Sequence, residues 1–135
     1  MRLDNNFIKQ LLLLPNIDVN KPNFKNVYPI VYAIITENIE IIQLIIKKAE
    51  FNINQQYIFG SILQALSEYN SLNAIFIDLV ENKNIDIFIM DQDNLTVIER
   101  VALNNNKIIF DYLYQYIITK YGNNVYDTSR FYTRN

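Results

Sequence analysis

Residues 17–20 read Ile-Asp-Val-Asn, and related strings stand at 51–54 (Phe-Asn-Ile-Asn) and 85–88 (Ile-Asp-Ile-Phe). The strings start at positions 17, 51 and 85, which are equally spaced along the chain. A fixed period of roughly 20 to 50 residues is typical of repeat architectures, in which each copy forms one supersecondary unit. The spacing therefore predicts the architecture more directly than it predicts a chemical activity.

The same period recurs at residues that favour tight turns. Asn26, Gly60 and Asn94 are separated by the same interval as the strings, and each precedes an apolar segment. Because Gly and Asn adopt a left-handed backbone at little cost, we expect a tight turn at each of these places. Each quoted string also carries an Asp or Asn whose side chain can satisfy turn amides after a helix has ended. These residues are Asp18, Asn52 and Asp86.

Each turn is followed by a short apolar segment, a polar break and a longer apolar segment, for example at 29–36, 37–38 and 39–48. The longer segment repeats its apolar residues at helical spacing, and so do its equivalents further along the chain. The positions are Ile41, Ile42, Leu44, Ile45 and Ile46, then Ile75, Phe76, Leu79 and Val80, then Ile109, Phe110 and Leu113, with Phe7, Ile8, Leu11 and Leu12 in a first, incomplete copy. The sequence therefore predicts an all-α fold of about seven helices, one lone helix followed by three helix pairs.

Helices this short and apolar are not stable alone, so stacking of successive pairs into a solenoid is expected to bury their apolar faces. The predicted repeat array covers 1–122. Its units are a partial repeat at 1–20 and repeats at about 21–54, 55–88 and 89–122, followed by a C-terminal tail at 123–135. Gly122 stands where a cap is expected after the last helical pattern, at 107–121.

Tyrosines crowd the C-terminal end of the chain: Tyr112, Tyr114, Tyr116, Tyr121, Tyr126 and Tyr132. A terminal repeat has one face without a neighbour and needs a cap there. We therefore expect the tail to fold back over the Tyr-rich helix. The alternative is an aromatic patch that binds a partner, since Tyr is enriched at interface hot spots.

The first copy has its longer helix but no short partner helix before it. Leu3, Phe7, Leu11 and Leu14 are then expected to present apolar area. Two interpretations follow. Either the chain continues a longer array whose upstream part is missing, or a partner or a second copy of the chain covers this face.

The unit at 28–33, Tyr-Pro-Ile-Val-Tyr-Ala, resembles the Thr-Pro-Leu-His-x-Ala motif of ankyrin repeats, and 96–102 aligns with it without gaps. Residues 91–96 resemble the family's Asp-x-x-Gly-x-Thr turn, with Asn94 in place of Gly, and 39–45 resembles the start of its second helix. The resemblance covers residues 5 to about 118 of an Ile- and Asn-rich chain, a composition typical of an AT-rich genome.

The middle copy departs from the motif. Gln64 stands where a buried Leu is expected, and a shift by one residue would instead place Leu63 and Leu66 at the buried positions. The motif's His is absent throughout, because the chain has no His.

The resemblance implies a non-enzymatic scaffold that binds another protein through its turn tips and through the concave face made by the short helices. The large aromatic residues among these positions are the expected anchors, since aromatic contacts dominate such interfaces. The implied contact residues are Phe24, Lys25, Val27, Tyr57, Phe59, Ser61, Tyr69, Gln92, Asp93, Leu95 and Asn104. The residues expected to form the turns are Asp18, Asn26, Asn52, Gly60, Asp86, Asp91, Asn94 and Thr96.

Composition argues against catalysis. Without His or Cys the common nucleophile–base pairs and zinc sites are excluded, and two Gly are too few for a phosphate-binding loop. Asp91 and Asp93 do not begin a calcium loop, because Leu95 and Ala102 occupy ligand positions. Glu99 and Arg100 are expected to form an exposed ion pair or to contact a partner. We therefore predict no enzymatic activity, no metal and no cofactor.

Charge and hydropathy limit the classes of partner that the chain is expected to bind. The formal net charge is −2 and the basic residues do not cluster, so nucleic acid is not expected. No apolar run approaches the roughly 20 residues that span a membrane. The absence of Cys fits an intracellular, cytoplasmic protein. The expected partner is another protein; the alternative function is a structural, self-associating fragment of a longer array that uses its exposed N-terminal face.

Overall fold

The computed structural model describes residues 5–14 and 17–122. This part of the chain is all-helical, as predicted, and contains one isolated β-bridge but no strand. Its elements are α1 (Asn5–Leu13), α2 (Pro29–Ile35), α3 (Ile39–Lys47), α4 (Ile62–Leu66), the 3₁₀-helix η1 (Asn70–Leu72), α5 (Asn73–Asn82), α6 (Val97–Asn104) and α7 (Lys107–Tyr121). The seven α-helices of these described ranges match the number that the apolar pattern predicts.

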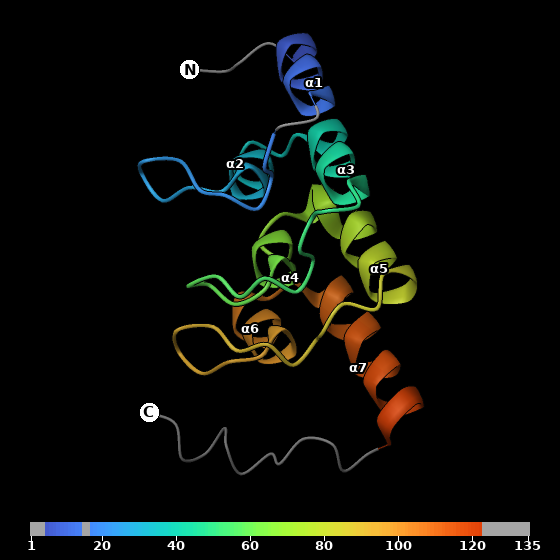
Figure 1. The fold of residues 1–135 in the computed structure, drawn as a ribbon. Coiled ribbons are helices and arrows are strands. Elements are labelled where there is room, and N and C mark those ends of the chain that lie inside the picture. Colours follow the sequence, from blue (N-terminus) through green and yellow to red (C-terminus); the bar gives the residue numbers. More distant parts are fainter. Residues whose placement is uncertain (1–4, 15–16, 123–135) are drawn as a thin grey trace.

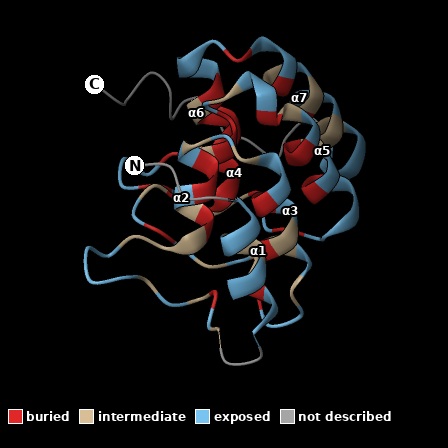
Figure 2. Cartoon of the chain, turned by 90° about the horizontal axis from the view of Figure 1, so that it is seen from above, coloured by how far each residue is buried: buried red, intermediate tan, exposed pale blue. Residues whose placement is uncertain are grey.

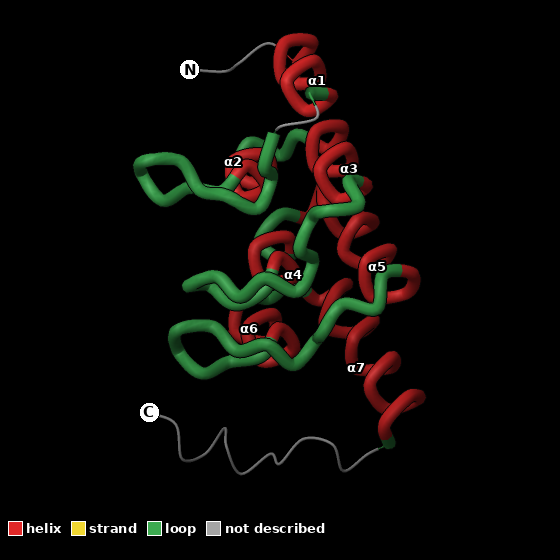
Figure 3. Tube along the Cα trace, in the orientation of Figure 1, coloured by secondary structure: helices red, strands yellow, loops and turns green. Residues whose placement is uncertain are grey.

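The helices form two rows (Figure 1). The short helices α2, α4 and α6 lie in one row, and α1, α3, α5 and α7 lie in the other. Within each pair the short helix packs against the long one, and α4 also packs against both α2 and α6. The turns before α2, α4 and α6 all extend to the same side, away from the long helices (Figure 3).

The core runs between the two rows. A view along the stack shows the buried residues gathered on the facing sides of the helices (Figure 2). The apolar stripes of the sequence supply these side chains, because residues three or four apart share one face of a helix. Among the largest fully buried side chains are Ile30, Ile34, Ile42, Ile45, Ile62, Leu63, Leu66, Leu72, Phe76, Leu79, Ile109 and Leu113.

Local sequence explains where the helices begin and end. Pro29 occupies the first turn of α2, where no amide donor is needed. Asn38 and Asn106 cap α3 and α7, each accepting a hydrogen bond from the amide three residues on, at 3.2 and 3.3 Å. Gly122 follows α7 with φ of 90°, at the position that the sequence indicates.

The N-terminal face is apolar where it is described. Leu12 is buried on the side of α1 that packs against α3. Phe7, Leu11 and Leu14 remain 68, 50 and 50% exposed. Leu3 and the tail at 123–135, with the two predictions made for that tail, lie outside the described residues. Across 5–14 and 17–122, no helix has the length and apolar character to cross a membrane.

Candidate functional site

Three turns on one side of the short-helix row carry most of the residues predicted from the sequence. Asn26, Gly60 and Asn94 have φ of 63, 99 and 59°, so all three lie in the left-handed region. Gly and Asn occupy this region at the lowest cost, which explains why these residue types recur once in every repeat.

The first and third turns share one construction. Asn23 Oδ1 accepts hydrogen bonds from the amides two and four residues on, at 2.9 and 3.0 Å. Asp91 Oδ1 makes the same two bonds in the third turn, at 2.9 and 3.1 Å. Backbone bonds of 2.9 Å from Asn23 N to Val27 O and from Asp91 N to Leu95 O close the two turns. Both turns therefore span five residues around one side-chain acceptor.

The second turn is one residue shorter. Tyr57 and Gly60 exchange two backbone hydrogen bonds, of 2.7 and 3.1 Å. The ring of Tyr57 stacks on the ring of Phe59 at 4.9 Å between centroids, and Tyr28 contacts the Tyr57 ring edge-on, also at 4.9 Å. Aromatic contacts thus stand here in place of the side-chain acceptor of the other two turns.

The shorter turn moves the start of α4 by one residue. Ser61 caps α4, and Gln64 Oε1 accepts from both Ser61 N and Ser61 Oγ at 2.8 Å. Thr96 and Glu99 form the corresponding capping box of α6, one position later than the repeat period alone would place it. The one-residue shift considered from the sequence is therefore present, and Leu63 and Leu66 are fully buried.

Gln64 is buried although it is polar. Besides its bonds to Ser61, its Nε2 donates to Ile89 O at 2.8 Å, which joins α4 to the segment that precedes the third turn. An amide with these three partners is satisfied in the interior, so an apolar side chain is not required there.

Four residues for which the sequence predicts an exposed role are buried. Tyr57, Ser61 and Leu95 are predicted to contact a partner, but they are 9, 1 and 3% exposed and hold the turns. Glu99 is predicted to form an exposed ion pair with Arg100 or to contact a partner, but it is 1% exposed and accepts from the Thr96 amide. The turn positions fold back onto the short helices, and this burial is invisible in a repeat motif.

The recurring strings hold successive loops together. The side chains of Asp18, Asn52 and Asp86 each accept from the amide two residues on, at 2.9, 3.2 and 2.9 Å. Asn20 and Asn54, which sequence reasoning missed, link one copy to the next. Asn20 Oδ1 accepts from Asn52 N at 2.7 Å, and Asn54 Oδ1 accepts from Asp86 N at 2.8 Å. These two asparagines are themselves one repeat period apart, a signal that could have found them.

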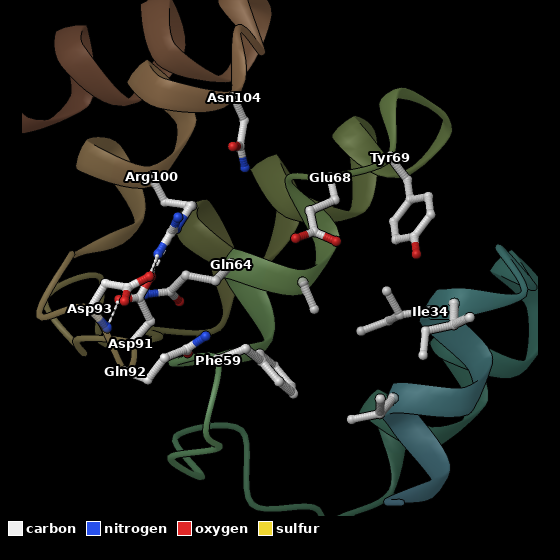
Figure 4. A pocket seen from close by; sticks show the side chains of 13 residues that line it. Ile34, Phe59, Gln64, Glu68, Tyr69, Asp91, Gln92, Asp93, Arg100 and Asn104 are labelled. Atoms are coloured by element: carbon white, nitrogen blue, oxygen red, sulfur yellow. Dashed lines mark hydrogen bonds and ion pairs between the residues drawn. The ribbon is translucent and has the colours of Figure 1, made fainter.

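A groove of about 280 Å³ opens along the row of short helices, between α2, α4 and α6 and beside the second and third turns (Figure 4). Its lining brings together five of the predicted contact residues: Phe59, Tyr69, Gln92, Asp93 and Asn104. The first turn does not contribute to this lining. Phe24 is 94% exposed at that tip, where Lys25 Nζ lies 5.8 Å from its ring, and Val27 is half-buried. We call the space lined by these five residues and their neighbours the short-helix groove.

Arg100, which sequence reasoning did not connect with the turn, lies at one end of the short-helix groove. Its Nε and Nη2 donate to Asp91 Oδ2 at 2.9 and 2.7 Å, and Nη2 also donates to Asp93 Oδ2 at 2.7 Å. Bonding to Asp93 and Asp91 raises the pKa of Arg100 in spite of its burial. The guanidinium therefore fixes the third turn against α6, and both carboxylates compensate its charge.

The other end of the short-helix groove is aromatic and acidic. Burial raises the pKa of Tyr69, and the negative charges of Glu68 and Glu37 raise it further. Glu68 is exposed and lines the groove from the end of α4. This end therefore presents a phenol ring next to the carboxylate of Glu68.

Among residues 5–14 and 17–122 no three acidic side chains gather into a group that could hold a metal ion. No family model matches the chain, and comparisons with curated proteins and with solved structures found no match. Function is therefore inferred from the short-helix groove itself.

Proposed function

We propose that the chain is a divergent array of ankyrin-type repeats and that it acts as a non-enzymatic module that binds another protein. Three features support the family assignment: the helix pairs, the equally spaced left-handed turn residues, and the turn Asp or Asn that recurs in each string. An intracellular, cytoplasmic location stays a prediction from the sequence.

The short-helix groove carries the proposal. It is concave, it lies on the row of short helices, and it combines an aromatic end with an ion-paired end. Such a surface offers the aromatic anchors that dominate protein interfaces, surrounded by polar groups that fix orientation. Tyr69 and Phe59 are the proposed anchors, since both are half-buried and line the groove.

Affinity capture with matched variants tests the proposal. We expect the wild-type chain to capture a partner protein. The Tyr69→Ala variant should bind that partner about tenfold or more weakly, as expected for an aromatic hot spot. Tyr114→Ala is the control, because Tyr114 is 49% exposed on α7 and lies outside the groove lining. Asn104→Ala provides a second groove variant at an exposed position, where substitutions have little effect on folding. Equal capture by all four proteins would rule out the groove as the binding surface.

A second function is favoured by one observation, the exposed apolar face of α1. Phe7, Leu11 and Leu14 follow one another at helical spacing and share one side of the helix region. We propose as the alternative that a second copy of this chain covers this face, in a structural, self-associating role. An apolar face of this kind is typical of interaction surfaces.

Sedimentation separates the two functions. Self-association predicts a concentration-dependent dimer that Leu11→Glu converts to a monomer. Leu103→Glu is the control, because Leu103 is 64% exposed on α6, away from α1. A wild-type chain that stays monomeric at every concentration contradicts the self-association proposal and leaves the short-helix groove as the candidate.

A further inference from the structure

The short-helix groove has two chemically different parts. Its apolar part is formed by Val31 and Ile35 of α2 together with Phe59 of the second turn. Ile35 remains 58% exposed, so apolar area is available there to a ligand. Its polar part is formed by the segment after α4, by α6 and by the third turn, which supply Glu68, Arg100 and two aspartates (Figure 4).

The charge of the groove is negative. Three carboxylates, those of Glu68, Asp91 and Asp93, line it against the single guanidinium of Arg100. An anionic ligand would have to remove Arg100 from both aspartates, and the side chain of Asp91 is only 2% exposed. An anion is therefore disfavoured, whereas a cation is attracted to a surface of this sign.

The position for a cation is beside Tyr69. Glu68 and Tyr69 both line the short-helix groove, and their side chains project into the same part of it (Figure 4). A Lys or Arg side chain placed there gains attraction from the Glu68 carboxylate and from the face of the phenol ring. Phe59 and the exposed part of Ile35 lie in the same groove, within reach of an apolar side chain of the same ligand.

We infer that the occupant of the short-helix groove is a segment of a partner protein that carries an apolar side chain and a Lys or Arg close to it in sequence. The apolar side chain packs on Ile35 and Phe59, and the cation lies between Glu68 and Tyr69. This inference rests on the proposed function, since it names the partner chemistry for the same site.

Selection from a random peptide display library tests the inference on the full chain. The wild-type protein is expected to enrich peptides that pair Leu, Ile, Phe or Met with Lys or Arg. A synthetic peptide of the enriched sequence should bind Glu68→Lys about tenfold or more weakly than wild type, because like charges then meet across the interface. Asp111→Lys makes the same charge change at an exposed position of α7 outside the groove and should bind as wild type does.

The outcomes of the selection distinguish a failure of the cationic occupant from a failure of groove binding as such. Enrichment of acidic or uncharged peptides, or equal binding by Glu68→Lys and Asp111→Lys, overturns the cationic occupant while a binding module remains. A selection that enriches no peptide overturns both the occupant and the groove-binding function. The melting temperatures of both charge variants are measured as a control. Values close to that of wild type establish that a loss of binding does not result from a loss of folding.

Discussion

The second turn, at 57–60, and the third turn, at 91–95, precede equivalent short helices but are held in different ways. The third turn closes around the carboxylate of Asp91, which the guanidinium of Arg100 fixes from α6. The second turn has no such acceptor and is one residue shorter, with stacked rings and Gly60 in its place. Polar bonds of Asp91 thus hold the third turn, and the ring contact of Tyr57 with Phe59 holds the second turn.

The difference in length between the two turns shows which parts of the chain keep the repeat period. The residue missing from the second turn is regained after α4, where η1 lengthens the link to the next helix. As a result Asn38, Leu72 and Asn106, at the starts of the three long helices, keep the same equal spacing as the recurring strings. The period is therefore kept at the starts of the long helices, whereas the short helix α4 begins one residue earlier than the period predicts.

Gly60→Ala should have the largest effect on this comparison. An added Cβ would lie 2.5 Å from Gln64 Cδ, and φ of 99° is unfavourable for any residue with a side chain. We expect the free energy of unfolding to fall by about 3 kcal/mol in urea titrations. Asn94→Ala is the matched control, because it adds no such clash to a left-handed turn, and a loss of about 1 kcal/mol is expected there. Equal losses for the two variants would show that the close approach to Gln64 does not matter.

Gln64→Leu tests the polar residue inside the core. The change removes the acceptor of the Ser61 amide and the donor to Ile89 O, and Leu burial offsets only part of that loss. A decrease of about 2 kcal/mol in the free energy of unfolding is expected. Glu99→Gln keeps an acceptor oxygen in the equivalent box of α6, so a change below about 1 kcal/mol is expected. A more stable Gln64→Leu would mean that the apolar residue of the repeat motif suits this position better.

Alkaline pH should weaken the packing of Tyr57 in the second turn, and its effect on stability should be the smallest of the three. Burial, followed by the electrostatic effect of the neighbouring Tyr28, raises the pKa of Tyr57 above its ordinary value. A raised pKa favours the neutral phenol in the folded state, so this stabilisation is complete below about pH 10 and is lost as the pH rises further. Melting temperatures should therefore fall less between neutral and alkaline pH in Tyr57→Phe than in wild type. Identical pH profiles would remove Tyr57 as the cause.

The helices were predictable because their information is local. Apolar residues at helical spacing placed the short and long segments of the first pair within one residue of the observed ends of α2 and α3. Gly122 ended α7 where a left-handed residue can follow a helix. These features depend only on neighbouring residues, which a single sequence displays.

The candidate site was predictable only in part, because it depends on contacts between copies. Five residues that the sequence predicts for a binding face do line one groove: Phe59, Tyr69, Gln92, Asp93 and Asn104. Tyr28 of the preceding copy packs on Tyr57, and Arg100 bonds to aspartates seven and nine residues earlier in its own copy. The apolar spacing displays neither contact. The spacing Ser-x-x-Gln at 61–64 is a local signal for the capping box. The repeat alignment does not indicate it, because the alignment compares Gln64 with a buried Leu.

The amides of Asn20 and Asn54 have a consequence for how such a chain can grow. Each side chain accepts a bond from the backbone 32 residues further on, in the loop of the next copy. The segment 21–54 therefore contains both the donor that its predecessor needs and the acceptor that its successor needs. An in-frame duplication of this segment would be joined at both ends by bonds that already exist. The asparagine ladder thus makes the array extensible by copying one block, without the evolution of a new joint.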